Sequence, residues 1–132
     1  IVVLPLHPRT KNCIDKFNLH ESLGNIFLIE PQSYLNMIFL ERNASLVVTD
    51  SGGLQKEAYL QGTPCVTVRK ETEWIELVEL GFNKLANPFD KYKIIDCMNE
   101  QIKLKIKAEY PTIYGDGYAS DIIVSKLKEL NF

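Results

Sequence analysis

Short runs of apolar and often β-branched residues alternate along the chain with longer segments in which apolar residues recur at helical spacing. The short runs predict strands at Ile1–Leu4, Ile26–Ile29, Leu46–Thr49, Cys65–Val68 and Lys84–Ala86. Most of these runs are continuously apolar, which is typical of strands that are buried on both faces. The repeated alternation of strand and helix predicts an α/β fold with a Rossmann-like parallel sheet flanked by helices.

Helical spacing fills the segments between the predicted strands. We expect helices near Thr10–Leu19, Ser33–Arg42, Leu54–Leu60 and Glu73–Leu80. In the second of these, Leu35 and Phe39 belong to one apolar stripe. Gly24, Gly62 and Gly81 stand where helices should end, each shortly before the next strand.

The pattern after Asp90 fits more than one structure. Asp90 can cap a helix that runs through Met98. The segment 101–107 alternates like a strand, but its apolar residues also continue the helical face, and we favour a helix into this region. Pro111 ends it, and apolar residues at helical spacing predict a closing helix that includes Ile123, Leu127 and Leu130.

The composition fits a globular protein of one domain. The sequence has 132 residues, of which 45% are hydrophobic and 24% are charged, values close to the globular average. The formal net charge of −2 gives no electrostatic reason to expect nucleic acid or an anionic membrane as a partner. Binding of an anionic ligand would therefore depend on backbone amides, a helix end or a few basic side chains.

The three cysteines Cys13, Cys65 and Cys97 lack the spacing of metal ligands. We therefore expect no metal site, and unpaired thiols in a reducing, cytoplasmic compartment. No apolar run approaches the roughly 18 residues that a membrane helix needs. The sequence opens on Ile1 within a strand-like run and not on Met, so we expect it to be a piece of a longer protein.

In open parallel sheets, ligands bind beyond the carboxyl ends of the strands. The first candidate site residue is therefore His7, which directly follows the first predicted strand. Its imidazole can donate to a phosphate oxygen or move a proton near neutral pH. The neighbouring Arg9 offers a planar fork that suits phosphate. The alternative is that Pro5 and Pro8 only shape a loop and that His7 caps the end of the sheet.

The second candidate is the segment Ser51-Gly52-Gly53, which lies between a buried strand and the start of a helix. This arrangement can cradle a phosphate, because the glycines let backbone amides approach its oxygens and the helix N-terminus carries a positive partial charge. Ser51 adds a hydroxyl, and Glu57 lies about one turn into the helix, within reach of a ribose diol. The alternative is a capped helix after a tight Gly-Gly turn, and the full dinucleotide-binding fingerprint is absent.

Two further clusters follow later in the chain. Arg69 comes just after the fourth predicted strand, ahead of an acidic and aromatic turn that ends at Trp74, and this cluster could border a sugar-phosphate. The alternative is that Thr72 or Glu71 starts a helix and that Trp74 packs on its neighbours. The segment Tyr114–Ser120 places two glycines around an aspartate and indicates a turn before a capped helix.

Taken in order, these clusters resemble the C-terminal half of the non-hydrolysing UDP-N-acetylglucosamine 2-epimerase family. The resemblance extends over essentially the whole chain and is carried by the segments Pro5–Thr10, Pro31–Leu35, Thr49–Ala58, Gly62–Arg69, Thr72–Glu76, Gly81–Leu85 and Tyr114–Ser120. Asp-Ser-Gly-Gly at 50–53 and Tyr-Gly-Asp-Gly at 114–117 are the most diagnostic.

Members of this family have two Rossmann-like domains of the GT-B type, with the substrate in the cleft between them. The resemblance implies that residues 1–132 are the second, UDP-binding domain and that the partners are a UDP-sugar and an N-terminal domain. It implies an isomerase that converts UDP-N-acetylglucosamine to UDP-N-acetylmannosamine by eliminating UDP and adding it back, without a cofactor. A homodimeric, cytoplasmic enzyme of cell-surface polysaccharide synthesis is also implied.

The resemblance assigns roles to single residues. By position, the diphosphate would be held by Ser51, Gly52 and Gly53, the ribose hydroxyls by Glu57, and uracil by Gln32. His7 matches a histidine near the diphosphate that helps UDP leave and return, and Arg69 matches an arginine that follows the fourth strand.

The chain also departs from the family's pattern. Its segment 7–12 reads His-Pro-Arg-Thr-Lys-Asn where a bacterial branch has His-Arg-Arg-Glu-Asn. Met37 stands where some members carry an aromatic residue near uracil, and Trp74 where they carry arginine. These changes are compatible with another sugar nucleotide, such as a diacetamido-uronic acid, or with lost allosteric control.

Several functions remain open from the sequence. A hydrolysing epimerase would release the free sugar, and a glycosyltransferase of the same architecture fits the motifs less well. A UDP-binding module without catalysis is the alternative of another class, because the family's acidic proton-transfer residues lie in the first domain. The motifs also leave open the sugar, the product and the oligomeric state.

Overall fold

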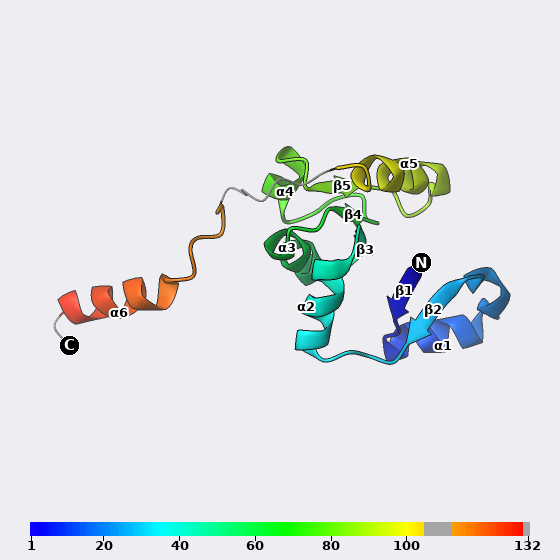
Figure 1. Ribbon diagram of the computed structural model, residues 1–132, viewed down its shortest axis with the longest axis horizontal. Coiled ribbons are helices and arrows are strands. Elements are labelled where there is room, and N and C mark those ends of the chain that lie inside the picture. The colour runs from blue at the N-terminus through cyan, green and yellow to red at the C-terminus, as the bar shows by residue number, and fades with distance from the viewer. Residues whose placement is uncertain (105–111, 131–132) are drawn as a thin grey trace.

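The computed structural model describes residues 1–104 and 112–130 (Figure 1). Its strands are β1 Val2–Pro5, β2 Ile26–Ile29, β3 Val47–Thr49, β4 Cys65–Thr67 and β5 Asn83–Leu85. Its α-helices are α1 Pro8–Lys16, α2 Tyr34–Asn43, α3 Gly52–Gln61, α4 Ile75–Glu79, α5 Lys91–Gln101 and α6 Ala119–Glu129. A 3₁₀ helix, η1, spans His20–Leu23 and was not predicted.

The predicted elements are confirmed, with ends displaced by a few residues. Gly62 ends α3 in the left-handed conformation (φ 76°), and Gly81 follows α4 with φ 76°. Both positions suit glycine, which lacks the Cβ that penalises this region. Asp90 caps α5 by accepting from the Lys93 amide at 2.9 Å. The helix ends at Gln101, so the predicted helical continuation is wrong for residues 102–104, and from 105 onward it lies outside the described residues.

All strand pairs are parallel, which confirms the predicted fold class. The strands form two sheets, however, and not the single sheet that we expected: β1 pairs with β2, and β3, β4 and β5 form a second sheet in that order. Figure 1 shows the β1–α1–β2 unit beside the three-stranded sheet. Apolar runs predict where strands lie and that they are parallel, but they do not determine which edges join.

The core lies on both faces of β4. One cluster of buried residues consists of Val47, Ala58 and Cys65, and another consists of Val66, Ala86 and Cys97. Because successive side chains of a strand point to opposite faces, Cys65 packs on the side of α3 and Val66 on the side of α5. This double cover explains why the run Cys65–Thr67 is apolar or small throughout.

Other apolar faces are exposed. On the stripe of α2, Leu35 is 77% exposed and Phe39 is 67% exposed. Helix α6 extends away from the two sheets (Figure 1), and Ile123 and Leu127 on its predicted stripe are exposed. Among residues 1–104 and 112–130, no helix has the length and apolar character that crossing a membrane requires.

Candidate functional site

The carboxyl ends of β3 and β4 lie side by side. Thr49 pairs with Thr67 in the register, and the Val68 amide donates to the Thr49 carbonyl at 2.8 Å. Since Ser51 and Arg69 each follow their strand by two residues, they emerge at the same edge of the sheet. The structure thus brings the second and third sequence clusters together.

The Ser51-Gly52-Gly53 turn opens α3, as predicted. Ser51 occupies the N-cap position with extended backbone (φ −79°, ψ 130°), and Gly52 and Gly53 are the first helical residues. The Ser51 hydroxyl makes no capping hydrogen bond, so the first amides of the helix rely on other acceptors. Amides at a helix start and the positive end of the helix dipole are groups that can bind an anion.

Gly52 is closely covered on the side where a Cβ would stand. A Cβ there would collide with the Glu73 carboxylate Oε1 and come within 3.8 Å of Trp74 Nε1. The Trp74 indole Nε1 also donates to the Gly52 carbonyl at 2.8 Å. A side chain at position 52 would therefore displace the Glu73 carboxylate, whereas its Cβ would stand at ordinary contact distance from the Trp74 indole.

Arg69 is engaged by an acid beside the turn. Its guanidinium Nη1 donates to Glu73 Oε2 at 3.0 Å, and both side chains are partly exposed. The pKa of Glu73 is lowered, first by the hydrogen bond from its own backbone amide and then by Arg69. The Glu73 carboxylate thus approaches the turn where an anionic ligand would bind, and it neutralises the cation that such a ligand would use.

A buried polar network fixes the turn at the start of α3. Gln55 is fully buried, and its Oε1 accepts from Thr72 Oγ1 at 2.6 Å and from Asn83 Nδ2 at 3.0 Å. Its Nε2 donates to the Ser51 carbonyl at 3.3 Å. Asn83 in turn accepts from Thr67 Oγ1 at 2.9 Å. These contacts fix the start of α3 against β4, β5 and the segment after β4, and sequence reasoning did not find them.

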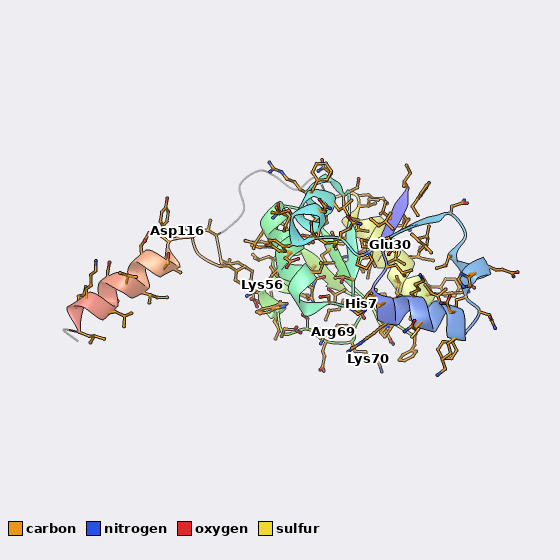
Figure 2. The ribbon with its side chains drawn as sticks, turned by 90° about the horizontal axis from the view of Figure 1, so that it is seen from below. His7, Glu30, Lys56, Arg69, Lys70 and Asp116 are labelled. Carbon is orange, nitrogen blue, oxygen red and sulfur yellow. The ribbon has the colours of Figure 1, made fainter. Side chains whose placement is uncertain are left out.

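The Tyr114 segment closes one side of the site. Lys56 Nζ lies 3.7 Å from the centroid of the Trp74 ring and 4.2 Å from that of Tyr114. Tyr114 Oη donates to Glu76 Oε1 at 2.6 Å, and burial, followed by this carboxylate, raises the pKa of the phenol. In Figure 2, Lys56 lies at the packed part of the chain that contains the sheets, whereas Asp116 lies away from it, near the start of α6.

Glu57 lies in the second turn of α3 and is half-buried. It faces Glu41 of α2, whose pKa is raised to about 7 by burial first and by the nearby Glu57 second. Neither carboxyl oxygen of Glu41 has a hydrogen-bond partner among the described residues.

His7 and Gln32 belong to other parts of the chain. His7 occupies the N-cap of α1, where its Nδ1 accepts from the Arg9 amide at 3.2 Å. Gln32 Nε2 donates to the Glu30 carbonyl at 2.6 Å, and its Oε1 accepts from Asn36 at 3.1 Å. These hydrogen bonds are local and do not join either residue to the turn at the start of α3. His7 thus has a capping role, although at a helix and not at the sheet.

The chain matches a family model described as UDP-N-acetylglucosamine 2-epimerase over residues 1–128. A UDP-N-acetylglucosamine 2-epimerase homolog of Methanococcus maripaludis is 42% identical, over 98% of this chain and 36% of its own length. The UDP-2,3-diacetamido-2,3-dideoxy-D-glucuronate 2-epimerase of Pseudomonas aeruginosa is also 42% identical, over 98% of this chain and 35% of its own. The chain thus spans about a third of the length of these curated relatives.

Solved structures of UDP-GlcNAc 2-epimerases are also similar to this chain. The UDP-GlcNAc 2-epimerase of Methanocaldococcus jannaschii, in complex with UDP-GlcNAc and UDP, has a TM-score of 0.83 and 38% identity, and the match covers 96% of this chain and 35% of that chain. The enzyme of Neisseria meningitidis bound to UDP-GlcNAc has a TM-score of 0.73 and 35% identity, with 96% and 36% covered. These matches confirm the resemblance that the motifs indicated.

Proposed function

We propose that this chain is the UDP-binding half of a UDP-sugar 2-epimerase. The premise is that the chain belongs to the UDP-N-acetylglucosamine 2-epimerase family. The observation that carries the proposal is the Ser51-Gly52-Gly53 turn at the carboxyl end of β3, where α3 begins without a capping hydrogen bond from the Ser51 side chain. The reaction is the inversion of C2 in UDP-N-acetylglucosamine, which gives UDP-N-acetylmannosamine.

The diphosphate binds at the start of α3. The amides of Gly52 and Gly53 and the hydroxyl of Ser51 donate to its oxygens, and the helix dipole favours its charge. Preorganisation supports this role, because Gln55 and Trp74 already hold the turn through the carbonyls of Ser51 and Gly52. A turn that is fixed before binding loses little entropy when the ligand arrives.

Arg69 contributes by exchanging one anion for another. In the free chain its guanidinium pairs with Glu73 at 3.0 Å. When a diphosphate occupies the turn, the Glu73 carboxylate moves aside because two anions repel one another, and Arg69 is released to donate to phosphate oxygens. The ion pair therefore keeps the empty site neutral.

The remaining contacts involve the nucleoside and the leaving group. Glu57 accepts from the ribose hydroxyls, and Gln32 contacts uracil. His7 donates a proton or hydrogen bond to the diphosphate as it leaves, a role that requires the β1–α1–β2 unit to approach the turn in the complete cleft.

The chemistry needs groups beyond those of this chain. A base removes the C2 proton while the bond between C1 and the diphosphate oxygen breaks, which gives 2-acetamidoglucal and UDP. UDP then adds back to C1, and C2 takes a proton on the opposite face. Because the assigned residues contact UDP and not the sugar ring in this proposal, we assign the base to the N-terminal domain, and this chain holds UDP between the two steps.

The cellular location, the oligomeric state and the biological role are part of the same proposal. We place the enzyme in the cytoplasm, as a homodimer that supplies sugar nucleotide for cell-surface polysaccharide. The three free thiols support a reducing compartment.

A second candidate substrate is a UDP-2,3-diacetamido-uronic acid. It is supported by the Pseudomonas aeruginosa relative, which acts on such a sugar by name and is as similar to this chain as the first homolog. The two candidates share the UDP site and differ only at the sugar.

The test is solvent deuterium incorporation at C2, followed by mass spectrometry. We expect no exchange with the 132-residue chain and exchange at C2 when an N-terminal epimerase domain precedes it. The difference should amount to several powers of ten, since general acid–base groups alone contribute about 10²–10⁴. Exchange by the chain alone would refute the two-domain assignment, and no exchange in the longer protein would favour a UDP-binding module.

A further inference from the structure

The side chain of Lys56 lies against two aromatic rings beside the turn at the start of α3. Its Nζ is 3.7 Å from the centroid of the Trp74 ring and 4.2 Å from that of Tyr114. Among the described residues, the other lysines near a ring face lie 5.1–5.8 Å from its centroid. Lys56 is also half-buried, and a cation that is partly removed from water interacts more strongly with a ring face than an exposed one does.

The Tyr114 ring is anchored independently of Lys56. Its Oη donates to Glu76 Oε1 at 2.6 Å, and the ring meets Tyr59 edge-on, with centroids 5.6 Å apart and planes at 90°. The Trp74 ring also stands edge-on to Tyr114, with centroids 6.3 Å apart. Because Tyr114 is fixed in this way, the ammonium that lies against both rings ties the Trp74 indole to a rigid support.

Trp74 connects this support to the turn. Its Nε1 donates to the Gly52 carbonyl at 2.8 Å. The Gly52 carbonyl and the Gly53 amide belong to one planar peptide group, so a donor that fixes the carbonyl also fixes the direction of the amide. Glycine on both sides leaves this peptide with more conformational freedom than others, and the hydrogen bond to its carbonyl also polarises the amide as a donor.

We propose that Lys56 is a positioning residue of the diphosphate site, because its ammonium holds the Trp74 indole in the orientation that fixes the peptide between Gly52 and Gly53. This inference rests on the proposed function, since it takes the diphosphate as the ligand of the Gly53 amide. Lys56 does not contact the ligand itself. Its charge acts on the ring face, and Tyr114 supplies the second face that keeps the ammonium in place.

The experiment compares Lys56→Met with Lys56→Arg in the 132-residue chain. Methionine keeps an apolar stem without the charge, whereas arginine keeps a cation that stacks on aromatic faces. The matched control is Lys91→Met, which removes one positive charge from an exposed lysine that lies 5.1 Å from the Tyr92 ring centroid in α5. UDP affinity is measured by calorimetry. The sequence contains one tryptophan, so the indole N–H signal in a ¹⁵N NMR spectrum reports on Trp74 alone.

We expect Lys56→Met to bind UDP about fivefold more weakly than the unaltered chain, the equivalent of one partly buried cation–π contact. Lys56→Arg should restore affinity to within about twofold, and Lys91→Met should bind as the unaltered chain does. In the absence of UDP, the indole signal of Trp74 and the amide signal of Gly53 should both move in Lys56→Met. Equal affinities of Lys56→Met and Lys91→Met would overturn the positioning role.

A double-mutant cycle separates positioning from direct attraction between the Lys56 charge and UDP. Trp74→Phe removes the indole donor to the turn and keeps an aromatic ring. If Lys56 acts through Trp74, adding Lys56→Met to Trp74→Phe should cause little further loss of affinity, because the two changes break the same link. A fivefold loss in both backgrounds would contradict the proposal and assign Lys56 a direct electrostatic effect on the ligand.

The spectra without ligand distinguish failure of this inference from failure of the proposed function. If the Trp74 and Gly53 signals move together in Lys56→Met but no chain binds UDP, the proposed function fails and the link from Lys56 to the turn stands. If the unaltered chain binds UDP and Lys56→Met binds it equally well, the inference fails alone. Urea denaturation checks that each variant is folded, and Lys56→Gln replaces Lys56→Met, with the same expected loss, if the methionine variant does not fold.

Discussion

Two β–α–β units of this chain have the same local plan and very different surroundings. In β1–α1–β2 and in β3–α3–β4, two parallel strands flank one helix, and a polar turn follows the first strand. Val66 and Thr67 of β4 are fully buried, whereas Val2 of β1 is 55% exposed and Phe27 of β2 is 60% exposed. The difference arises because α3 and α5 both cover β4. The strands of the second unit are therefore more buried than those of the first, and the turn after β3 starts from a better packed strand pair.

The turns differ in the same way. The Ser51-Gly52-Gly53 turn is held by Gln55, four residues from Ser51, and by Trp74, 22 residues from Gly52, and Gln55 is itself bonded to Thr72 and Asn83. His7 is held by the amide of Arg9, two residues away. A turn held by its own neighbours can shift as a unit, whereas a turn held across the fold keeps its shape. The comparison predicts that nucleotide affinity in this chain resides in the second unit.

The largest effect should come from Gly52→Val. A side chain here collides with Glu73 and approaches the Trp74 indole, and it blocks the approach of phosphate to the first amides of α3. We expect UDP affinity to fall at least about 100-fold, close to the loss of two hydrogen bonds to a charged ligand. Calorimetry measures it, and Leu60→Ala, at an exposed position of the same helix, is the control that should bind normally. Equal affinity in Gly52→Val would remove the turn from the site.

Gln55→Leu should lower the free energy of unfolding by about 2–3 kcal/mol, because it leaves the hydroxyl of the half-buried Thr72 and the amide of the buried Asn83 without their acceptor. The matched change in the first unit is His7→Ala, which removes one exposed cap and should cost about 1 kcal/mol or less. Urea denaturation gives both values. Similar losses in the two variants would mean that the two units are equally stabilised.

Glu57→Ala should weaken UDP about tenfold, since one hydrogen bond from the ribose diol to a carboxylate is lost. A uridine diphosphate without the 2′ and 3′ hydroxyls should bind the variant and the unaltered chain alike. This pair of ligands identifies the role of Glu57 within the second unit. Equal losses for both ligands would assign Glu57 a purely structural role beside Glu41.

The smallest effect should come from Glu73→Gln. The change removes the charge that neutralises Arg69 in the free chain, and UDP then no longer displaces an anion from the turn. We expect about two- to threefold tighter binding, in the range that exposed ion pairs allow. The gain should shrink at high salt, which screens exposed charges. Weaker binding would indicate that Glu73 contacts the ligand favourably.

The sequence was most informative where the signal is local. An apolar run followed by Ser-Gly-Gly predicted the start of α3 after β3, and the structure places it there. Gln55 and Asn83, by contrast, are 28 residues apart and meet only in the folded chain. The burial of the unpartnered Glu41 carboxyl and the division into two sheets have the same origin, because burial and strand edges depend on long-range packing that periodicity does not contain.

An NMR titration of the ¹⁵N-labelled chain with UDP tests the central claim, that the turn at the start of α3 holds the diphosphate. The account predicts that the amide signals of Ser51, Gly52 and Gly53 shift most, and that they shift less in Gly52→Val at the same UDP concentration. Largest shifts at His7–Thr10, with the signals of Gly52 and Gly53 unchanged, would contradict it and assign nucleotide binding to the first unit.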